Sequence, residues 1–180
     1  LRLGDLLGYD HTPHHAGGVE VTVDVTPNDD DTWGVILNYD AGARTYYKLA
    51  IDIQRDKRAH IIKVNGDASR VAKTSINNLA VLQGQADTYT ISLKSRDGVV
   101  QAYINGILVG HFVDSDPLSG GKIALANAAT GSNGTNGKPA VYKNLRLEMF
   151  DLVVFNYTGE EVRYTVPQNE FTIEAWGAQG

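Results

Sequence analysis

Acidic side chains gather in two predicted loops of this chain, where they could bind a metal ion. The first loop, Pro-Asn-Asp-Asp-Asp, contributes Asp29, Asp30 and Asp31, and the second, Val-Asp-Ser-Asp-Pro, contributes Asp114 and Asp116. Carboxylate oxygens are the ligands that Ca²⁺ prefers, and a flexible loop tolerates its irregular coordination. Acidic residues are also common in turns for solubility and turn geometry alone. The expectation is therefore structural Ca²⁺ at these five residues or no metal at all, and no other cofactor.

Aromatic and planar polar side chains could form a second kind of site, one that binds a sugar. Sugar rings pack on aromatic faces, and a few well-placed polar groups fix their orientation. Tyr46 and Tyr103 lie opposite the apolar positions of their predicted strands, so we expect both side chains to be exposed. Gln101 and Arg44 are the planar polar groups near them in the sequence. These four residues are the predicted ligand-binding set, and the alternative is that the tyrosines only cover sheet edges.

The acidic residues on predicted strands do not indicate catalysis. Glycoside hydrolysis needs two carboxylates on either side of the scissile bond, roughly 5–10 Å apart. The nearest acidic pair is Glu20 and Asp24, with Thr22 between them, and the simpler interpretation is a solvated strand face. The sequence contains no nucleophile elbow and no Gly-rich phosphate loop that opens a helix. It also contains no cysteine, which excludes thiol catalysis and disulfide bonds.

The elements that position these residues are predicted to be β-strands. Apolar and polar residues alternate with period two in short runs that turn signals separate. The predicted strands are 18–26, 32–40, 45–54, 59–66, 87–95, 99–104, 108–114, 122–128 and 140–150, and 67–85 is expected to mix a short strand with loop. Trp33 and Tyr39 share a face with other apolar residues, so both are expected in the core. The pair Asn105–Gly106 predicts a two-residue hairpin, because both turn positions need positive φ.

Many short strands at even spacing, without helical periodicity, predict an all-β fold. We expect a two-sheet antiparallel jelly-roll sandwich in which each sheet has one dry and one wet face. The runs "WGVILNYD", "TYYKLAIDI", "YINGILVG", "DPLSGGKIALANA" and "AVYKNLRLE" resemble the concanavalin A-like jelly roll of the laminin-G-like type. They are also similar to the sandwich of bacterial 3-keto-disaccharide hydrolases. The resemblance covers most of residues 15–148, and what it implies is the fold.

The sequence predicts three parts: an N-terminal segment 1–14, the jelly roll 15–149, and a short C-terminal β extension 150–180. The last part contains too little apolar surface to fold alone. Its run "FNYTGEEVRYTVPQNEFTIEAWGAQG" resembles the opening strands of glycine-rich domains in bacterial surface proteins and some receptor ectodomains. This resemblance implies an extracellular, multidomain parent. The extension is expected to dock on its own jelly roll or to pair with another copy of the chain.

Overall charge limits the class of partner. The net charge of −5 argues against nucleic acid or an anionic membrane surface. No apolar run is long enough to span a bilayer. The first hypothesis is a non-catalytic extracellular or cell-surface module for carbohydrate binding or adhesion, with a glycan as partner. The second is a structural subunit of an extracellular filament or matrix, assembled through its terminal strands. A glycoside or 3-keto-sugar hydrolase ranks last, because it rests on fold analogy alone.

Overall fold

The structure is a computed structural model that describes residues 18–53, 56–66, 69–127 and 138–150. These residues form ten strands and no helix, so no helix among them could cross a membrane. The strands are β1 Gly18–Thr26, β2 Trp33–Asp40, β3 Thr45–Asp52, β4 Arg58–Asn65, β5 Ser69–Ile76, β6 Tyr89–Arg96, β7 Val99–Ile104, β8 Ile107–Val113, β9 Lys122–Asn127 and β10 Val141–Phe150. All predicted strands are present within one or two residues, and β5 is the strand of the weakly patterned stretch.

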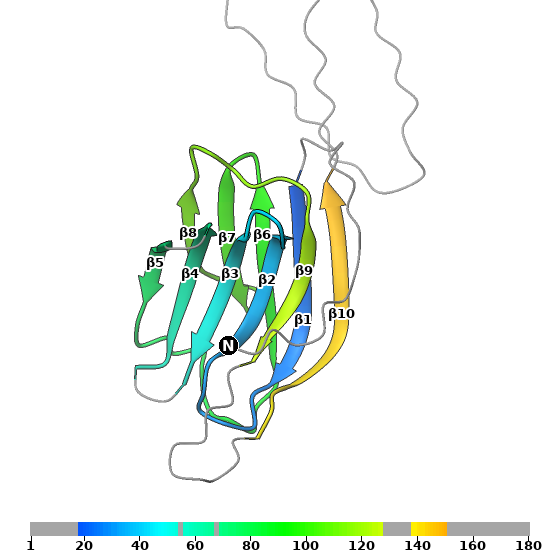
Figure 1. The fold of residues 1–180 in the computed structure, drawn as a ribbon. Coiled ribbons are helices and arrows are strands. Elements are labelled where there is room, and N and C mark those ends of the chain that lie inside the picture. The colour runs from blue at the N-terminus through cyan, green and yellow to red at the C-terminus, as the bar shows by residue number, and fades with distance from the viewer. Residues whose placement is uncertain (1–17, 54–55, 67–68, 128–137, 151–180) are drawn as a thin grey trace, which may run out of the picture.

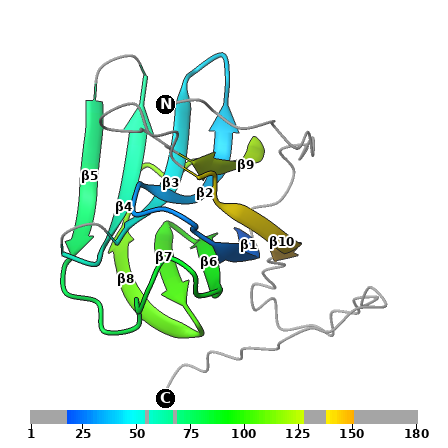
Figure 2. The ribbon, with the colours of Figure 1, turned by 90° about the horizontal axis from the view of Figure 1, so that it is seen from below.

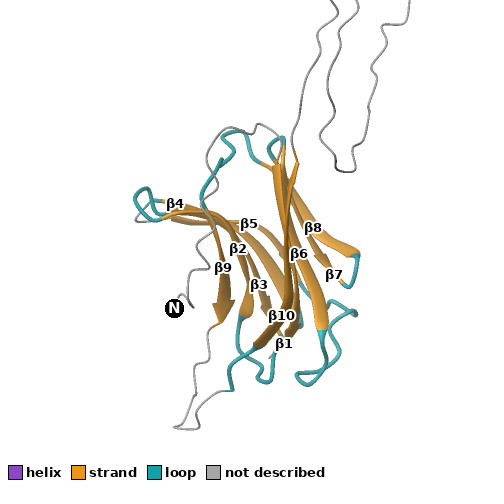
Figure 3. Ribbon diagram, turned by 90° about the vertical axis from the view of Figure 1, so that its right-hand side faces the viewer, coloured by secondary structure: helices purple, strands orange, loops and turns teal. Residues whose placement is uncertain are grey.

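Two five-stranded antiparallel sheets lie face to face (Figures 1 and 3). Sheet I has the strand order β10-β1-β6-β7-β8, and sheet II has the order β5-β4-β3-β2-β9. Seen from below, the two sheets form separate layers, and each has an outer face that points away from the other sheet (Figure 2). The predicted all-β jelly-roll sandwich is therefore confirmed.

Alternating apolar residues of both sheets fill the space between the layers. On β1 the valines at 19, 21, 23 and 25 are buried, and the residues between them are only partly buried. Trp33 and Tyr89 come from opposite sheets and stack with their ring centroids 5.6 Å apart. The period of two thus places one residue set in the core and leaves the other for the outer faces.

The hairpin between β7 and β8 has the predicted two-residue turn. Asn105 has φ of 52° and Gly106 has φ of 76°, and the flanking Ile104 and Ile107 pair across the strands. The Asn105 side chain accepts a hydrogen bond of 2.9 Å from the Thr90 amide. The turn is therefore tied to β6, which fixes the end of the hairpin against its neighbour.

Tyr39 does not lie in the core, so the prediction for this residue was wrong. Between the pairs Ile36↔Ala124 and Tyr39↔Lys122, β2 has one more residue than β9. Asn38 occupies this β-bulge with φ of 53° and turns its side chain inward, where it is buried. One extra residue reverses the alternation, so Tyr39 lies on the outer face of sheet II.

Residues 1–17 and 151–180 lie outside the described residues, as does the loop 128–137. The N-terminal segment 1–14 therefore stays a prediction. The C-terminal extension 150–180 also stays a prediction, because Phe150, the last residue of β10, is the only one of its residues that the structure describes. The same holds for assembly through the C-terminal strands, and with it for the structural-subunit hypothesis.

Candidate functional site

The four predicted ligand-binding residues lie on two different faces of the sandwich. Arg44 is in the turn between β2 and β3, and Tyr46 lies on the outer face of β3 in sheet II. Gln101 and Tyr103 belong to β7 in sheet I, and their side chains alternate with buried core residues. The two sheets are about 10 Å apart even before side chains are counted. One small ligand cannot contact both pairs, so the predicted set is two separate candidates.

Gln101 and Tyr103 belong to a polar surface that three adjacent strands build. The register across β1, β6 and β7 aligns these side chains in rows: Lys94 lies between Glu20 and Gln101, and Ser92 lies between Thr22 and Tyr103. We call this surface the polar face of sheet I; it comprises Glu20, Thr22, Asp24, Thr90, Ser92, Lys94, Gln101 and Tyr103. Within its own strand, each of these residues is only one of the alternating outward positions. The pairing of the three strands brings them together on one surface.

The polar face is hollowed near its centre. The hollow has a volume of about 230 Å³ and is lined by Glu20, Thr22, Thr90, Ser92, Lys94, Tyr103 and Gly106. Thr22, Thr90 and Ser92 contribute short hydroxyl side chains to this lining, and Lys94 and Tyr103 contribute its longest side chains. Gly106 leaves one end open, because it has no side chain and no atom lies within 4 Å of where a Cβ would be. Pockets for drug-sized ligands have about 300–1,000 Å³, so this hollow suits one ring-sized part of a ligand.

A carboxylate–ammonium pair lies at one end of the hollow. The Ser92 hydroxyl donates a hydrogen bond to Oε1 of Glu20, and Nζ of Lys94 lies 3.7 Å from Oε2. The same ammonium group lies 4.4 Å from the ring centroid of Phe150 on β10. The side chains of Lys94 and Glu20 are 23% and 20% exposed, so a part of each reaches the surface.

A second carboxylate, Asp24, lies next to the hollow and contacts Thr90, one of its lining residues. The Asn144 amide donates to Oδ2 at 2.8 Å, and the Thr90 hydroxyl donates to Oδ1 at 2.7 Å. These hydrogen bonds lower the pKa of Asp24, that from Asn144 first and that from Thr90 second. Asp24 is therefore an ionised acceptor at neutral pH. Because Asp24 and Glu20 are four residues apart on β1, about 13 Å along the strand, they do not match the spacing of a glycosidase pair.

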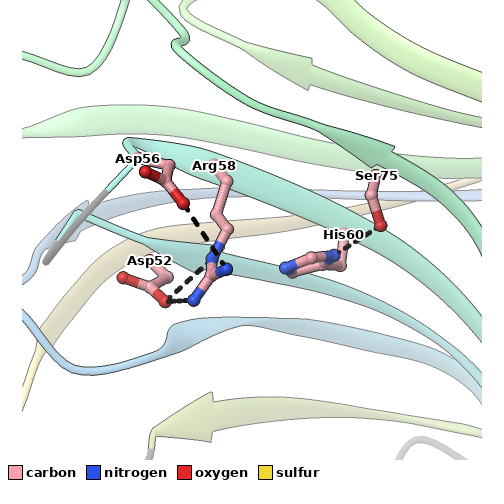
Figure 4. A network of polar contacts seen from close by, with 5 residues as sticks. All are labelled: Asp52, Asp56, Arg58, His60 and Ser75. Carbon is pink, nitrogen blue, oxygen red and sulfur yellow. Dashed lines mark hydrogen bonds and ion pairs between the residues drawn. The ribbon is translucent and has the colours of Figure 1, made fainter.

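The outer face of sheet II carries a different polar network, which sequence inspection missed (Figure 4). Nη2 and Nε of Arg58 donate to Oδ2 of Asp52 at 2.9 and 3.2 Å, and Asp56 lies 3.8 Å from Nη1. Nδ1 of His60 and the Ser75 hydroxyl share a hydrogen bond of 2.8 Å. Burial lowers the pKa of His60, the charge of Arg58 lowers it further, and Asp52 opposes them. The imidazole is therefore neutral at pH 7. The sequence feature that could have predicted this network is the position of Asp52 and Arg58 on either side of the β3–β4 turn, where the two residues pair.

Of the predicted calcium ligands, Asp114 is held inside the protein by other side chains. Its Oδ2 lies 2.8 Å from Nζ of Lys63 and accepts a hydrogen bond of 2.7 Å from the Tyr47 hydroxyl. Lys63 also donates to the backbone carbonyl of Asp116, and the amide of Asp116 donates to Oδ1 of Asp114 at 3.2 Å. The charge of Asp114 thus has an ammonium group as its neighbour. The segment 114–116 is anchored to the strands of sheet II by this contact.

The other predicted calcium ligands, Asp29 to Asp31, lie in the turn before β2. Asp29 accepts hydrogen bonds from the amides of Asp30 at 2.7 Å and Lys138 at 3.0 Å. Its hydrogen bond with the carboxyl group of Asp30 raises the pKa of Asp30, and burial and like charge add to this. Within the described ranges no group of three or more His, Asp or Glu side chains has an arrangement that could hold a metal ion. Calcium at this turn stays a prediction.

The calcium prediction has a direct test in thermal unfolding. If the turn binds Ca²⁺ in the folded state only, millimolar Ca²⁺ should raise the melting temperature and a chelator should lower it, by mass action. Mg²⁺ should replace Ca²⁺ poorly, because a flexible acidic turn suits the larger ion. Asp30→Asn should remove the response while keeping the size of the side chain. Identical melting curves with calcium and with chelator would count against the site.

No family model matches the sequence, and no curated protein matches it either. Solved structures do resemble the fold. A carbohydrate-binding module, CBM66 from Bacillus subtilis, is 19% identical with a TM-score of 0.57, over 74% of this chain and 76% of that one. The galectin LEC-6 from Caenorhabditis elegans is 12% identical with a TM-score of 0.55, over 82% and 94%. Sheep galectin-11, in complex with glycerol, is 10% identical with a TM-score of 0.57, over 82% and 99%. The likeness shows a shared fold, the predicted concanavalin A-like jelly roll.

Proposed function

We propose that this protein is a non-catalytic carbohydrate-binding module that binds a sugar on the polar face of sheet I. The observation that carries the proposal is the hollow of about 230 Å³ between β1, β6 and β7. It combines one aromatic side chain with three hydroxyl groups and a carboxylate–ammonium pair on a solvent-facing surface. A sugar ring presents an apolar face and a rim of hydroxyl groups, and this surface offers partners for both.

Each group in the hollow has a separate task in this proposal. Tyr103 packs against the apolar face of the sugar ring. Glu20 and Asp24 accept hydrogen bonds from sugar hydroxyl groups, because an ionised carboxylate has about four acceptor positions and only part of them are used by protein donors. Lys94 and Gln101 donate to ring or hydroxyl oxygens at the rim. The opening at Gly106 leaves room for the ligand to continue along the sheet.

Two further lines of support come from outside the hollow. Solved structures with a similar fold include a carbohydrate-binding module and galectins, which makes a sugar the first class of ligand to test. The resemblance of 155–180 to the opening of surface-protein domains supports an extracellular or cell-surface location for the parent protein. Both arguments are analogies, and the hollow is the physical basis of the proposal.

Binding should depend on Tyr103. A panel of immobilised neutral mono- and oligosaccharides is screened first, and the strongest binder is then measured by titration calorimetry. Tyr103→Ala should weaken binding about tenfold, because a lost aromatic contact of about 1.4 kcal/mol corresponds to that factor. Glu20→Gln should weaken it as well, by removing a charged acceptor.

The matched control is Tyr46→Ala, which removes the other predicted ligand tyrosine from the opposite side of the sandwich. It should leave the affinity unchanged. Loss of binding in Tyr46→Ala but not in Tyr103→Ala would move the site to sheet II. Full binding in both variants would mean that neither predicted pair contacts the sugar.

A further inference from the structure

Strand β10 forms one edge of sheet I, and no other described strand pairs with its far side (Figure 1). In an antiparallel sheet the N–H and C=O groups of alternate residues point to opposite sides, so half of those on β10 point away from β1. Such an edge is a template for pairing with another strand. The register with β1 shifts at Asn144 and Leu145, where β10 has one residue more than β1. The regular stretch that follows, 145–150, is the part of the edge that a second strand can pair with.

The side chains of this stretch alternate between charged and apolar. Arg146 and Glu148 are exposed and lie on the outer side, because their partners on β1 belong to the polar face of sheet I. Leu147 and Met149 lie on the core side, because their partners on β1 are buried valines. Leu145 also packs against the core, whereas Met149 is 44% exposed. The free edge thus carries two opposite charges on one side and apolar side chains on the other.

The charge of Glu148 has an unfavourable neighbour within its own sheet. Its partner on β1 is Glu20, and like charges in directly opposite positions destabilise a strand pair. Glu20 has Lys94 and Ser92 as polar partners. In the part of the chain that the structure describes, no cation forms an ion pair with Glu148. A cation supplied from outside the chain would therefore be favourable at this position.

We propose that two copies of this protein form a symmetric dimer, in which their β10 strands pair antiparallel about Leu147. The two-fold axis is perpendicular to the joined sheet, so an outward residue of one copy meets an outward residue of the other. Near the middle of the stretch the axis can therefore pass at Arg146, at Leu147 or at Glu148. The first choice places two guanidinium groups opposite each other, and the last places two carboxylates opposite each other, which is unfavourable.

The axis at Leu147 makes both sides of the edge complementary to themselves. On the outer side, Arg146 of each copy meets Glu148 of the other copy, which gives two ion pairs. On the core side, Leu145 of each copy meets the exposed Met149 of the other. Opposite charges and apolar side chains in directly opposite positions both stabilise a strand pair. The charges of β10 thus select the partner, a second copy of this chain, and the register.

The dimer has a consequence for binding that rests on the proposed function, whereas the dimer itself does not. The perpendicular axis leaves both polar faces on the same side of the joined sheet. Five strand spacings separate β6 of one copy from β6 of the other, which is about 24 Å. Two hollows at this spacing could bind two sugars of one surface at once, and the second binding event would then be intramolecular.

Analytical ultracentrifugation of the full chain over a range of concentrations tests the proposal. The unchanged protein should show a reversible monomer–dimer equilibrium. Arg146→Glu and Glu148→Arg should each weaken dimerisation at least about tenfold, because each change places like charges opposite each other twice. The double variant Arg146→Glu, Glu148→Arg should return the dissociation constant to within about threefold of its original value, because opposite charges meet again. It retains both local changes beside β1, so the recovery reports contact between copies.

The matched control is Lys143→Glu, which makes the same charge change on β10 before the register shift, outside the paired stretch. It should leave the dimer unchanged. A protein that is monomeric at all concentrations would overturn the proposal. Equal weakening by Lys143→Glu and Arg146→Glu, or a double variant as weak as the single variants, would overturn it too.

Cysteine cross-linking tests the register independently. The chain contains no cysteine, so a disulfide formed by Leu147→Cys under mild oxidation reports contact between the two copies of this position. In the proposed register these positions are directly opposite, with Cα atoms about 4.5–5.5 Å apart, which suits a disulfide. In the control Arg146→Cys the Cα atoms are about 8 Å apart, which is too far. We expect a covalent dimer of Leu147→Cys only; a covalent dimer of Arg146→Cys only would overturn the register.

Discussion

Tyr89→Ala should lower the free energy of unfolding by about 3–5 kcal/mol, the range for removing a large aromatic side chain from a core. Tyr89 is buried between the sheets and stacks on Trp33. Its hydroxyl accepts hydrogen bonds from the amides of Gln83 and Gly84, both at 2.9 Å, and donates to the carbonyl of Gly84 at 2.8 Å. The variant would therefore have a cavity in the core and would also lose the anchor of the loop before β6. Urea unfolding measures the loss.

Two controls separate the contributions at this site. Tyr89→Phe keeps the ring and removes the hydroxyl, so it should cost about 1–3 kcal/mol for the polar groups left unpaired. Tyr103→Ala removes the same kind of side chain from the solvent-facing side of the same sheet, and it should cost less than 1 kcal/mol. Equal losses in Tyr89→Ala and Tyr103→Ala would contradict the assignment of the two faces.

Lys63→Met should be the second strongly destabilising change, also by about 3–5 kcal/mol, because it leaves a buried carboxylate without its cation. The side chains of Lys63 and Asp114 are only 7% and 5% exposed. Tyr47 would keep its hydrogen bond to Asp114, but one neutral donor does not replace an ammonium group. Lys63→Met combined with Asp114→Asn should recover part of the loss, since it removes the uncompensated charge.

The pH dependence distinguishes this explanation from a simple loss of packing. Burial raises the pKa of Asp114, but the hydrogen bonds from Lys63, Tyr47 and the Asp116 amide outweigh it, so the net shift is downward. A lowered pKa means that the contribution of Asp114 to stability is present above its ordinary pKa of 3.8 and is lost as the pH falls below it. Without Lys63, burial should raise the pKa, so the variant should become more stable as the pH falls through that raised value. Parallel stability–pH curves for the protein and Lys63→Met would contradict this account.

The two outer faces of the sandwich differ in chemistry, and this difference guides the functional proposals. On sheet I, Thr22 and Ser92 leave a polar hollow open to solvent. On sheet II, Ile36, Ala124 and Ala126 form an apolar cluster against which Tyr39 and Tyr46 pack. A first search for a sugar ligand therefore belongs on sheet I.

Local sequence determined the strands, the core and the hairpin of this protein. The alternation of apolar residues on β1, β3 and β6 depends only on the period of a β-strand, so it could be recognised without knowing which strands pair. The turn at Asn105–Gly106 was equally predictable, because the φ angles it needs restrict the residue types at two adjacent positions.

Tertiary structure decided which residues share a surface. Tyr46 and Tyr103 looked equivalent as outward tyrosines, but their strands belong to different sheets, and sheet membership depends on pairing between distant segments. The outward turn of Tyr39 depends on one extra residue relative to β9, which β2 alone does not reveal. Asp114 resembled a metal ligand beside Asp116, yet Lys63 from another sheet is its partner. Alternation is a property of one strand, whereas a site is a property of several, and only the folded chain sets their register.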